Sequence, residues 1–285
     1  MNQASPDKRA AIINSLINGV SVRAAARMTG TSKGTVLRLL DAVGEFCEVY
    51  HDYMVRSLMT TRLEADEQWS FCGAKQRNAK LPGQGDLWTF CCLDSDSKLV
   101  ISWLVGARSP DNASALMQDA AQRIATDQVM ISTDAWGGYP DAVRASFGWR
   151  RANYARVIKE YASPATEEAR RYSPPVCTSV RKEAVIGNPD MELAGTSFVE
   201  ALNLSTRQHC KRFARLTIAH SRKAENHASA VALNFFAHNF IRVHSTLSKR
   251  AGRKTTPAMA NGLAERPLTA EDVVAMLNPK TVTIK

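Results

Sequence analysis

Residues 87–105 read LWTFCCLDSDSKLVISWLV. Two apolar runs, 87–93 and 99–105, lie on either side of the polar turn sequence DSDS. Apolar segments of this length around a turn of Asp and Ser predict a β-hairpin. The adjacent Cys91 and Cys92 would point to opposite faces of its first strand. The chain has six cysteines, without C-x-x-C spacing, so we expect buried free thiols in a reducing compartment rather than a zinc finger.

Strand and helix signals alternate outward from this hairpin. Strand character precedes it over 61–73, and an amphipathic helix with apolar residues at helical spacing follows it over 113–124. Two further strands are predicted over 128–133 and 151–159, with another helix between them. The predicted order is thus three strands, a helix, a strand, a helix, a strand and then helices. This is the element order of an RNase H-like α/β sheet with helices on its faces.

We expect this core, retroviral integrase-like in its fold, over residues 60–248, with a basic C-terminal tail over 249–285. An insert at about 163–194 is predicted to be irregular, because Pro and Gly recur in it. These breakers are Pro164, Pro174, Pro175, Gly187 and Pro189. Two long helices are predicted after the insert, over 197–216 and 223–244.

The first 45 residues predict an all-α domain of their own. Apolar periodicity indicates short helices over 8–17, 22–28 and 33–43, with Ser21 as a cap and a glycine in the tight turn before the third helix. The small core of this domain is expected to contain Ala24, Ala25, Met28, Val36 and Leu39. Helix, tight turn and helix in this order fit a helix-turn-helix.

The third helix of such a unit lies in the major groove of DNA, and residues near its N-terminus reach base edges. We therefore expect Lys33, Thr35 and Arg38 to bind DNA. A helical connector over 46–59 would join the domain to the core. The alternative is an ordinary three-helix cap on a larger domain.

The formal net charge is +10, and it is concentrated in the last third of the chain. Residues 197–285 contain 14 Lys and Arg but 5 Asp and Glu, a balance of +9. A basic face attracts a polyanion, although solvated surface side chains are the alternative. Apolar stretches are too short to span a bilayer, and residues 1–9 lack a signal-peptide pattern, so we expect a cytoplasmic protein without a membrane partner.

Three acidic residues occupy positions that the predicted fold would bring together. Asp66 lies in the first strand and Asp134 at the end of the fourth, and these strands are neighbours in an RNase H-like sheet. Glu200 lies in the first turn of a helix that could reach the same edge. Three such carboxylates repel one another unless cations lie between them. Magnesium (Mg2+) or manganese (Mn2+) suits an all-oxygen site, and two ions about 4 Å apart support displacement at phosphorus.

The same helix offers further polar groups. Asn203 and Arg207 share a face with Glu200 and are expected to contact DNA, together with Lys211 and Arg212. Each acidic residue also has an ordinary alternative, as a turn, a cap or a partner of the helix dipole. Rivals to Asp66 are Glu64, on the same strand face, and Glu67, on the opposite face. Four histidines are expected to be helix-surface or packing residues rather than ligands or a proton relay: His209, His227, His238 and His244.

Three segments resemble the acidic motifs of bacterial insertion-sequence DDE transposases, closest to the IS-one type. They are EADEQWSF at 64–71, STDA at 132–135 and TSFVEALNL at 196–204. Shorter segments from NHA at 226–228 to TPA at 256–258 extend the similarity, which covers roughly residues 63–262. The resemblance implies a DDE polynucleotidyl transferase, with Asp66, Asp134 and Glu200 as ligands of two metal ions and Arg207 at the basic position after the Glu.

The resemblance also implies partners. Both partners are double-stranded DNA. One is the terminal inverted repeats of the element, which the N-terminal domain would bind, and the other is target DNA. Because two DNA ends must be handled together, we expect a homo-oligomer on DNA, in the bacterial nucleoid. The 66 residues from Asp134 to Glu200 exceed what a compact core needs, and Cys177 has no second cysteine nearby, so no zinc is predicted. The alternatives are a DNA-binding regulator derived from a transposase and an RNase H-like nuclease.

Overall fold

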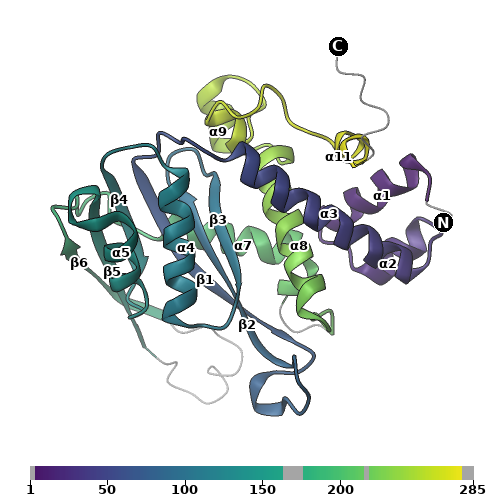
Figure 1. Ribbon diagram of the computed structural model, residues 1–285, viewed down its shortest axis with the longest axis horizontal. Coiled ribbons are helices and arrows are strands. Elements are labelled where there is room, and N and C mark those ends of the chain that lie inside the picture. Colours follow the sequence, from purple (N-terminus) through teal and green to yellow (C-terminus); the bar gives the residue numbers. More distant parts are fainter. Residues whose placement is uncertain (1–3, 163–175, 215–217, 278–285) are drawn as a thin grey trace.

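The structure, a computed structural model, describes residues 4–162, 176–214 and 218–277. Its centre is a six-stranded sheet with the order β3-β2-β1-β4-β5-β6 (Figure 1). The strands are β1 (Arg62–Cys72), β2 (Gly85–Asp94), β3 (Val100–Gly106), β4 (Val129–Asp134), β5 (Ala152–Ala162) and β6 (Val176–Ile186).

The strand directions confirm the predicted RNase H-like core. β1, β2 and β3 are antiparallel neighbours, and the turn after β2 joins the last two as the predicted hairpin. β4 and β5 run parallel to β1, because helices connect these strands and return the chain to the same end of the sheet. β6 pairs with β5 in the antiparallel direction.

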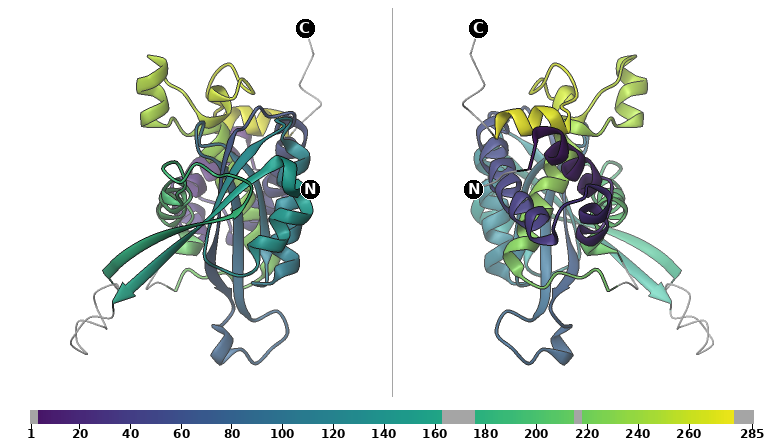
Figure 2. Two further views of the ribbon diagram at one scale, coloured as in Figure 1. Left: turned by 90° about the vertical axis from the view of Figure 1, so that its left-hand side faces the viewer. Right: turned by 90° about the vertical axis from the view of Figure 1, so that its right-hand side faces the viewer.

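Helices cover both faces of the sheet, as Figure 2 shows from the side. α4 (Pro110–Arg123) and α5 (Tyr139–Arg151) lie on one face, in the core cluster that includes Cys92. α7 (Ser197–His209) and α8 (Ala224–Phe236) lie on the other, in a cluster that includes Cys91. The two cysteines are therefore buried on opposite faces, as predicted, whereas Cys177 is exposed and departs from the expectation of buried thiols.

The N-terminal helices are α1 (Pro6–Ile17), α2 (Val22–Met28) and α3 (Lys33–Met54). Ser21 caps α2 by accepting a hydrogen bond from the backbone N–H of Ala24 (3.2 Å). The small core between them is Ile12, Ala25, Ala26 and Val36. Met28 was expected there, but this residue, the last of α2, is 70% exposed.

The predicted third helix and the predicted connector are one continuous 22-residue helix, α3. Gly44, between the two predicted helices, does not break it. A Cβ atom at Gly44 would lie 2.5 Å from the Cβ of Ser229, so this glycine permits close packing of α3 on α8. The N-terminal end of α3, which carries Lys33, Thr35 and Arg38, and its core-packing end therefore belong to one element, while the domain boundaries remain predictions.

Two further predictions about elements need correction. Part of the predicted irregular insert is the strand β6, bounded at its end by Gly187, whose φ of +65° favours glycine; Pro164, Pro174 and Pro175 lie outside the described residues. The first of the two long helices is shorter than predicted, since α7 ends at His209, whereas α8 continues as a π-helical turn, η3 (Ala237–Ile241), close to the predicted end at 244. The C-terminal segment contains α9 (Ser245–Ala251), α10 (Pro257–Ala260) and α11 (Ala270–Met276), and α11 packs on α1.

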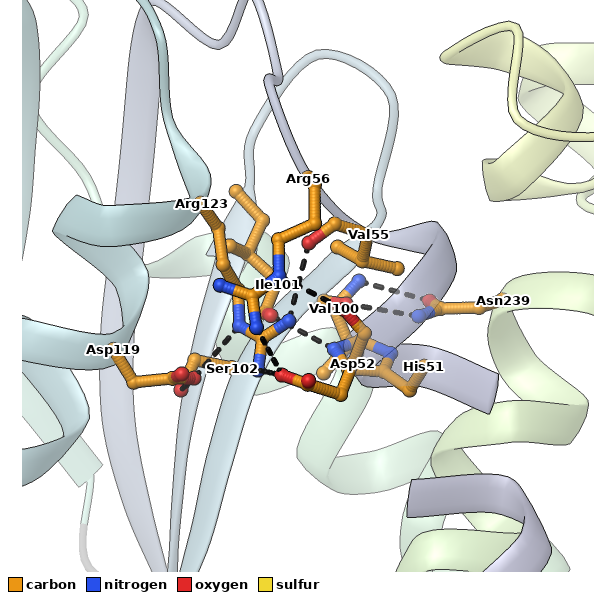
Figure 3. Close-up of polar contacts among 10 residues, drawn as sticks. All are labelled: His51, Asp52, Val55, Arg56, Val100, Ile101, Ser102, Asp119, Arg123 and Asn239. Atoms are coloured by element: carbon orange, nitrogen blue, oxygen red, sulfur yellow. Dashed lines mark hydrogen bonds and ion pairs between the residues drawn. The ribbon is translucent and has the colours of Figure 1, made fainter. Parts of the chain in front are cut away.

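Side chains cover the outer edge of β3 (Figure 3). The amide of Asn239 accepts from Val100 N (2.9 Å) and donates to Val100 O (2.8 Å). His51 Nε2 lies 2.9 Å from the carbonyl oxygen of Ile101. Satisfied edge groups of this kind are withheld from pairing with other strands. Among the described helices, none is both long and apolar enough to cross a membrane.

Arg123 fastens α3 to α4 next to this edge (Figure 3). Its guanidinium donates to the backbone oxygen of Val55 (3.1 Å) at the end of α3 and pairs with Asp52 (2.9 Å). Its Nε also pairs with Asp119 on α4 (2.8 Å). The long helix α3 is therefore held against the sheet at its C-terminal end.

Candidate active site

Asp66 and Asp134 lie side by side at the centre of the sheet. β1 and β4 are parallel neighbours, and Ala65 pairs with Thr133, so the next residue of each strand is an aspartate. One carboxylate oxygen from each, with one from Glu67, lies within 4.8 Å of the others. We call Asp66, Glu67 and Asp134 the acidic cluster. The predicted meeting of the first two carboxylates agrees with this geometry.

The charge of the cluster acts most strongly on Asp66. Burial, followed by the carboxylates of Glu67 and Asp134, raises the pKa of Asp66 to about 7. The Nδ2 of Asn203 on α7 donates a hydrogen bond to Asp66 Oδ2 (2.7 Å) and fixes its orientation. A carboxylate in such surroundings binds either a proton or a cation near neutral pH.

Asp134 ends β4, and its own loop holds it. The backbone N–H of Trp136 donates to Asp134 Oδ1 (3.0 Å). The side chain is half-buried, so one oxygen is oriented by the backbone. This arrangement presents a fixed carboxylate at the strand end.

Glu67 joins the cluster from the opposite strand face. The OH of Tyr139 donates to its Oε2 (2.8 Å), and Arg108 Nε donates to its Oε1 (2.7 Å). Burial and the charge of Asp134 nevertheless raise the pKa of Glu67. The alternation of β1 correctly predicts its face, but not that its carboxylate lies beside the two aspartates.

Glu200 lies near the cluster without being part of it. Its carboxylate is exposed, pairs with Lys159 Nζ on β5 and accepts a hydrogen bond from Thr196 Oγ1 (2.6 Å). Its charge contributes to the raised pKa of Asp66, which places the two groups within electrostatic reach. The first turn of α7 therefore places Glu200 near the acidic cluster, where Lys159 pairs with its carboxylate, and its role as a third metal ligand stays a prediction.

Glu64, the other rival to Asp66, has a different function. Its Oε2 accepts hydrogen bonds from the backbone N–H groups of Phe198 (2.8 Å) and Val199 (2.9 Å). A buried carboxylate at the N-terminus of a helix satisfies groups without intrahelical partners and complements the helix dipole. Glu64 thus anchors the start of α7, and with it Glu200, to β1.

The predicted DNA-contacting residues on α7 and after it fall into two groups. Asn203 is buried, and both its side chain and its backbone oxygen contact β1, through Asp66 and Gln68 (3.0 Å). Arg207 is half-buried one turn further along. Arg212 donates to Ser221 Oγ (3.0 Å), whereas Lys211 is exposed.

A basic groove separates the N-terminal helices from the segment between α7 and α8. It is a cavity of about 580 Å³ that Lys33, Lys211 and Arg212 all line. Further cations in its wall are Arg23, Arg27 and Arg222, and none of its described lining residues is acidic. Thr35 and Arg38 lie outside this wall: Thr35 bonds to the cap Ser32 (3.0 Å), and Arg38 is exposed. Three of the predicted DNA-contacting residues, distant in sequence, thus converge on one surface.

Comparison with known proteins addresses the family. Residues 59–169, which include Asp66 and Asp134, match the family model described as IS1 transposase. No curated protein sequence matches the chain.

Solved structures with similarity to the chain include a piggyBac transposase synaptic complex with hairpin DNA (11% identity, 97% of this chain and 71% of that chain, TM-score 0.42). Another is a simian T-cell lymphotropic virus intasome in complex with a PP2A regulatory subunit (14% identity, 93% of this chain and 77% of that chain, TM-score 0.37). A third is a Mos1 transposase paired-end complex (12% identity, 54% of this chain and 59% of that chain, TM-score 0.24). The match to the IS1 transposase family thus covers the part of the sheet that carries Asp66 and Asp134.

Proposed function

We propose that the chain cuts DNA at the ends of its element and joins the freed 3′-hydroxyl to target DNA, with Asp66 and Asp134 as ligands of divalent metal ions. The observation that carries this proposal is the placement of the two aspartates on adjacent parallel strands, with their oxygens within 4.8 Å of each other. Rigid strands hold both carboxylates in place before any ion binds.

The donor set fits a hard cation. The acidic cluster offers oxygen atoms alone. Burial, followed by the neighbouring carboxylates, raises the pKa of Asp66, and a bound cation would offset both effects. Such donors favour Mg2+ or Mn2+ over softer metals. Two ions bound at a site of this kind activate the attacking hydroxyl and stabilise the leaving oxygen of an in-line displacement at phosphorus.

Glu200 is proposed as the third ligand. Its anchored position at the start of α7 keeps it near Asp66, and release from Lys159 would free its carboxylate for a cation. Asn203 orients Asp66 through its hydrogen bond. Glu67 is the alternative third ligand, although Arg108 and Tyr139 already engage both of its oxygens.

The proposed partners are the terminal inverted repeats of the element and target DNA, both double-stranded. Lys33, Thr35 and Arg38 at the start of α3 are assigned to base edges and phosphates, and Lys211 and Arg212 to the backbone across the basic groove. The continuity of α3 supports this assignment, because a duplex held at its N-terminal end would have a fixed relation to the sheet. Handling two ends together would require a homo-oligomer on the DNA.

Strand cleavage and joining tests the proposal. A labelled duplex from the flank of the gene is incubated with the protein in Mg2+ or Mn2+, and the variants Asp66→Asn, Asp134→Asn and Glu200→Gln are compared with wild type. Glu271→Gln on α11, an exposed carboxylate remote from the sheet, is the matched control. We expect cleavage and joining by wild type and control, and intact DNA binding without cleavage by the three variants.

Each other outcome selects a different reading. Tight binding of the ends by wild type without cleavage in either metal would favour a DNA-binding regulator. Cleavage of any branched duplex without joining would favour a nuclease. Full activity of Glu200→Gln together with an inactive Glu67→Gln would move the third-ligand assignment to Glu67.

A further inference from the structure

Four aromatic residues lie on β1, on β2 and in the loop after β4, next to the acidic cluster. Alternation along β1 puts Trp69 and Phe71 on the same face as Glu67. Trp88 on β2 is the direct cross-strand partner of Trp69. Trp136 follows Asp134 by two residues. We call Trp69, Phe71, Trp88 and Trp136 the aromatic strip.

Arg108 links this strip to the acidic cluster. Its guanidinium carbon lies 4.8 Å from the ring centroid of Trp88 and 4.9 Å from that of Trp136. The same guanidinium pairs with the buried carboxylate of Glu67. A cation held between two indole rings and a carboxylate is fixed in position, so the strip begins at the candidate metal site.

The far end of the strip is open and carries positive charge. The rings of Trp69 and Phe71 lie 5.6 Å apart, and His220 stacks on Phe71 at 4.8 Å with an interplanar angle of 27°. The Nζ of Lys75 lies 5.7 Å from the Trp69 centroid. Trp69 is 39% exposed, and Phe71 and His220 are half-buried, so ring faces remain within reach of a ligand.

Packing within the sheet explains only part of this arrangement. Cross-strand aromatic pairs stabilise a β-ribbon, and the chain contains another exposed Trp beside an Arg: Trp149 on α5, with Arg144 at 5.0 Å. The strip differs from Trp149 because Trp88 and Trp136 both contact the guanidinium of Arg108, which pairs with Glu67 of the acidic cluster. Planar rings interleaved with cations complement a nucleic-acid strand, in which flat bases alternate with phosphates.

We propose that the aromatic strip binds unpaired nucleotides of the DNA strand next to the scissile phosphate. Bases stack on Trp69 and Phe71, and Lys75 and Arg108 face the phosphates. Unpaired nucleotides are the fitting ligand, because in a duplex the base faces are already stacked on one another. This inference rests on the proposed function only for the location of the scissile phosphate.

Binding of a fluorescent oligo-dT strand in EDTA, followed by anisotropy, tests the strip without any catalysis. Replacement of a stacking aromatic residue by Ala weakens single-strand binding by about 5- to 100-fold, and we expect this of Trp69→Ala. Trp69→Leu, which keeps an apolar side chain without a ring, should show the same loss, and Trp69→Phe should keep most of the affinity. Trp149→Ala is the matched control and should bind as wild type does.

Cleavage then tests whether the strip acts at the DNA end. Trp69→Leu should cut a fully paired end more slowly than wild type, and the difference should shrink on an end whose terminal base pairs are already mismatched. Equal oligo-dT affinity of Trp69→Leu, Trp69→Ala and wild type would overturn the inference, as would an equal loss of affinity for duplex DNA. Neither result would affect the test of Asp66 and Asp134, which depends on cleavage and metal.

Discussion

The strand carboxylates and the helix carboxylate of the candidate site are held in opposite ways. Asp66 and Asp134 lie in the rigid centre of the sheet, where hydrogen bonds from Asn203 and from the backbones of Glu67 and Trp136 offset only part of their mutual repulsion. Glu200 lies on an exposed helix turn and is already neutralised by Lys159. In the proposed site, a cation would bind the two aspartates where they stand, whereas Glu200 would first have to leave Lys159.

This difference indicates a site that is assembled in part. Binding of a proton or of a cation would relieve the repulsion between the aspartates. Glu200 can turn toward the cluster at the cost of one partly exposed ion pair, which is worth little in water. Binding of metal and DNA would thus complete the site. Variants that separate the two kinds of carboxylate are the most informative.

The largest effect is expected for the strand aspartates. Asp66→Asn and Asp134→Asn should each lower the rate of strand cleavage by about a thousandfold or more, since the charge stabilisation supplied by a bound ion is worth several kcal/mol. Glu67→Gln should cost less, because Arg108 and Tyr139 already engage its carboxylate. Single-turnover rates on one labelled end measure all three, and a loss for Glu67→Gln as large as for Asp66→Asn would contradict this ranking.

Acidification should lower the free energy of unfolding, because three histidines that pack around the sheet are buried or half-buried. Burial lowers the pKa of His51 and of His238 to about 4 and that of His227 to about 3. Their unfolded-state pKa is near 6.5, so the unfolded chain binds more protons between pH 6.5 and 4. The free energy of unfolding should therefore fall across that window as pH is lowered, by at most about 3 kcal/mol per histidine, and recover above it.

Thermal unfolding of metal-free protein at pH 7, 5.5 and 4.5 checks this prediction. Asp66 has the opposite effect on the free energy of unfolding, because its raised pKa favours the folded state at low pH. The contribution of the histidines is therefore measured by comparing histidine variants with wild type. His51→Gln should flatten the acid side of the profile. His209→Gln, at a half-buried position on α7, is the control, and equal flattening by both would contradict the assignment to buried histidines.

Removal of the Glu64 carboxylate should loosen the helix that carries Glu200. Glu64→Ala leaves two backbone N–H groups at the start of α7 without an acceptor, which costs about 1–3 kcal/mol of stability. Glu64→Gln keeps an accepting oxygen and should lose less. Denaturant unfolding with both variants measures the difference, and an unchanged midpoint for Glu64→Ala would show that Glu64 does not anchor α7.

The smallest effect is expected at the pair that holds Glu200. Lys159→Met should strengthen Mn2+ binding by about 2- to 5-fold, since an exposed ion pair contributes at most about 1 kcal/mol. Arg156→Met, which breaks the pair with Glu183 (3.0 Å) further along the same two strands, is the matched control. Calorimetric titration measures both, and weaker Mn2+ binding by Lys159→Met would contradict competition between Lys159 and the ion.

The sequence predicts those parts of the fold that depend on local periodicity. The apolar runs around the turn before Lys98 suffice for the hairpin, and the spacing of Ala113, Leu116 and Ala120 suffices for α4. The sequence predicts a helix boundary near Gly44 because nothing local explains a glycine there. The residue that requires it, Ser229, lies on α8, far away in the sequence. β6 was missed because the breakers that delimit a strand resemble those of a loop.

The site shows the same division between local and long-range information. Strand order brings Asp66 and Asp134 together, and helix position brings Glu200 near them. The pairing of Glu200 with Lys159, the use of Glu64 as a cap and the closeness of Glu67 all depend on side chains from other elements. Only Glu67 carried a local signal, since it adjoins Asp66.

Metal-specific rescue tests the central claim most directly. Asp66→Cys and Asp134→Cys each replace a hard oxygen ligand by a softer thiolate, which disfavours Mg2+ more than Mn2+. We predict that both variants fail to cleave the labelled end in Mg2+ and recover measurable cleavage in Mn2+, while Asp66→Asn recovers in neither. Cleavage by either Cys variant in Mg2+ at the wild-type rate would contradict metal binding by these two aspartates.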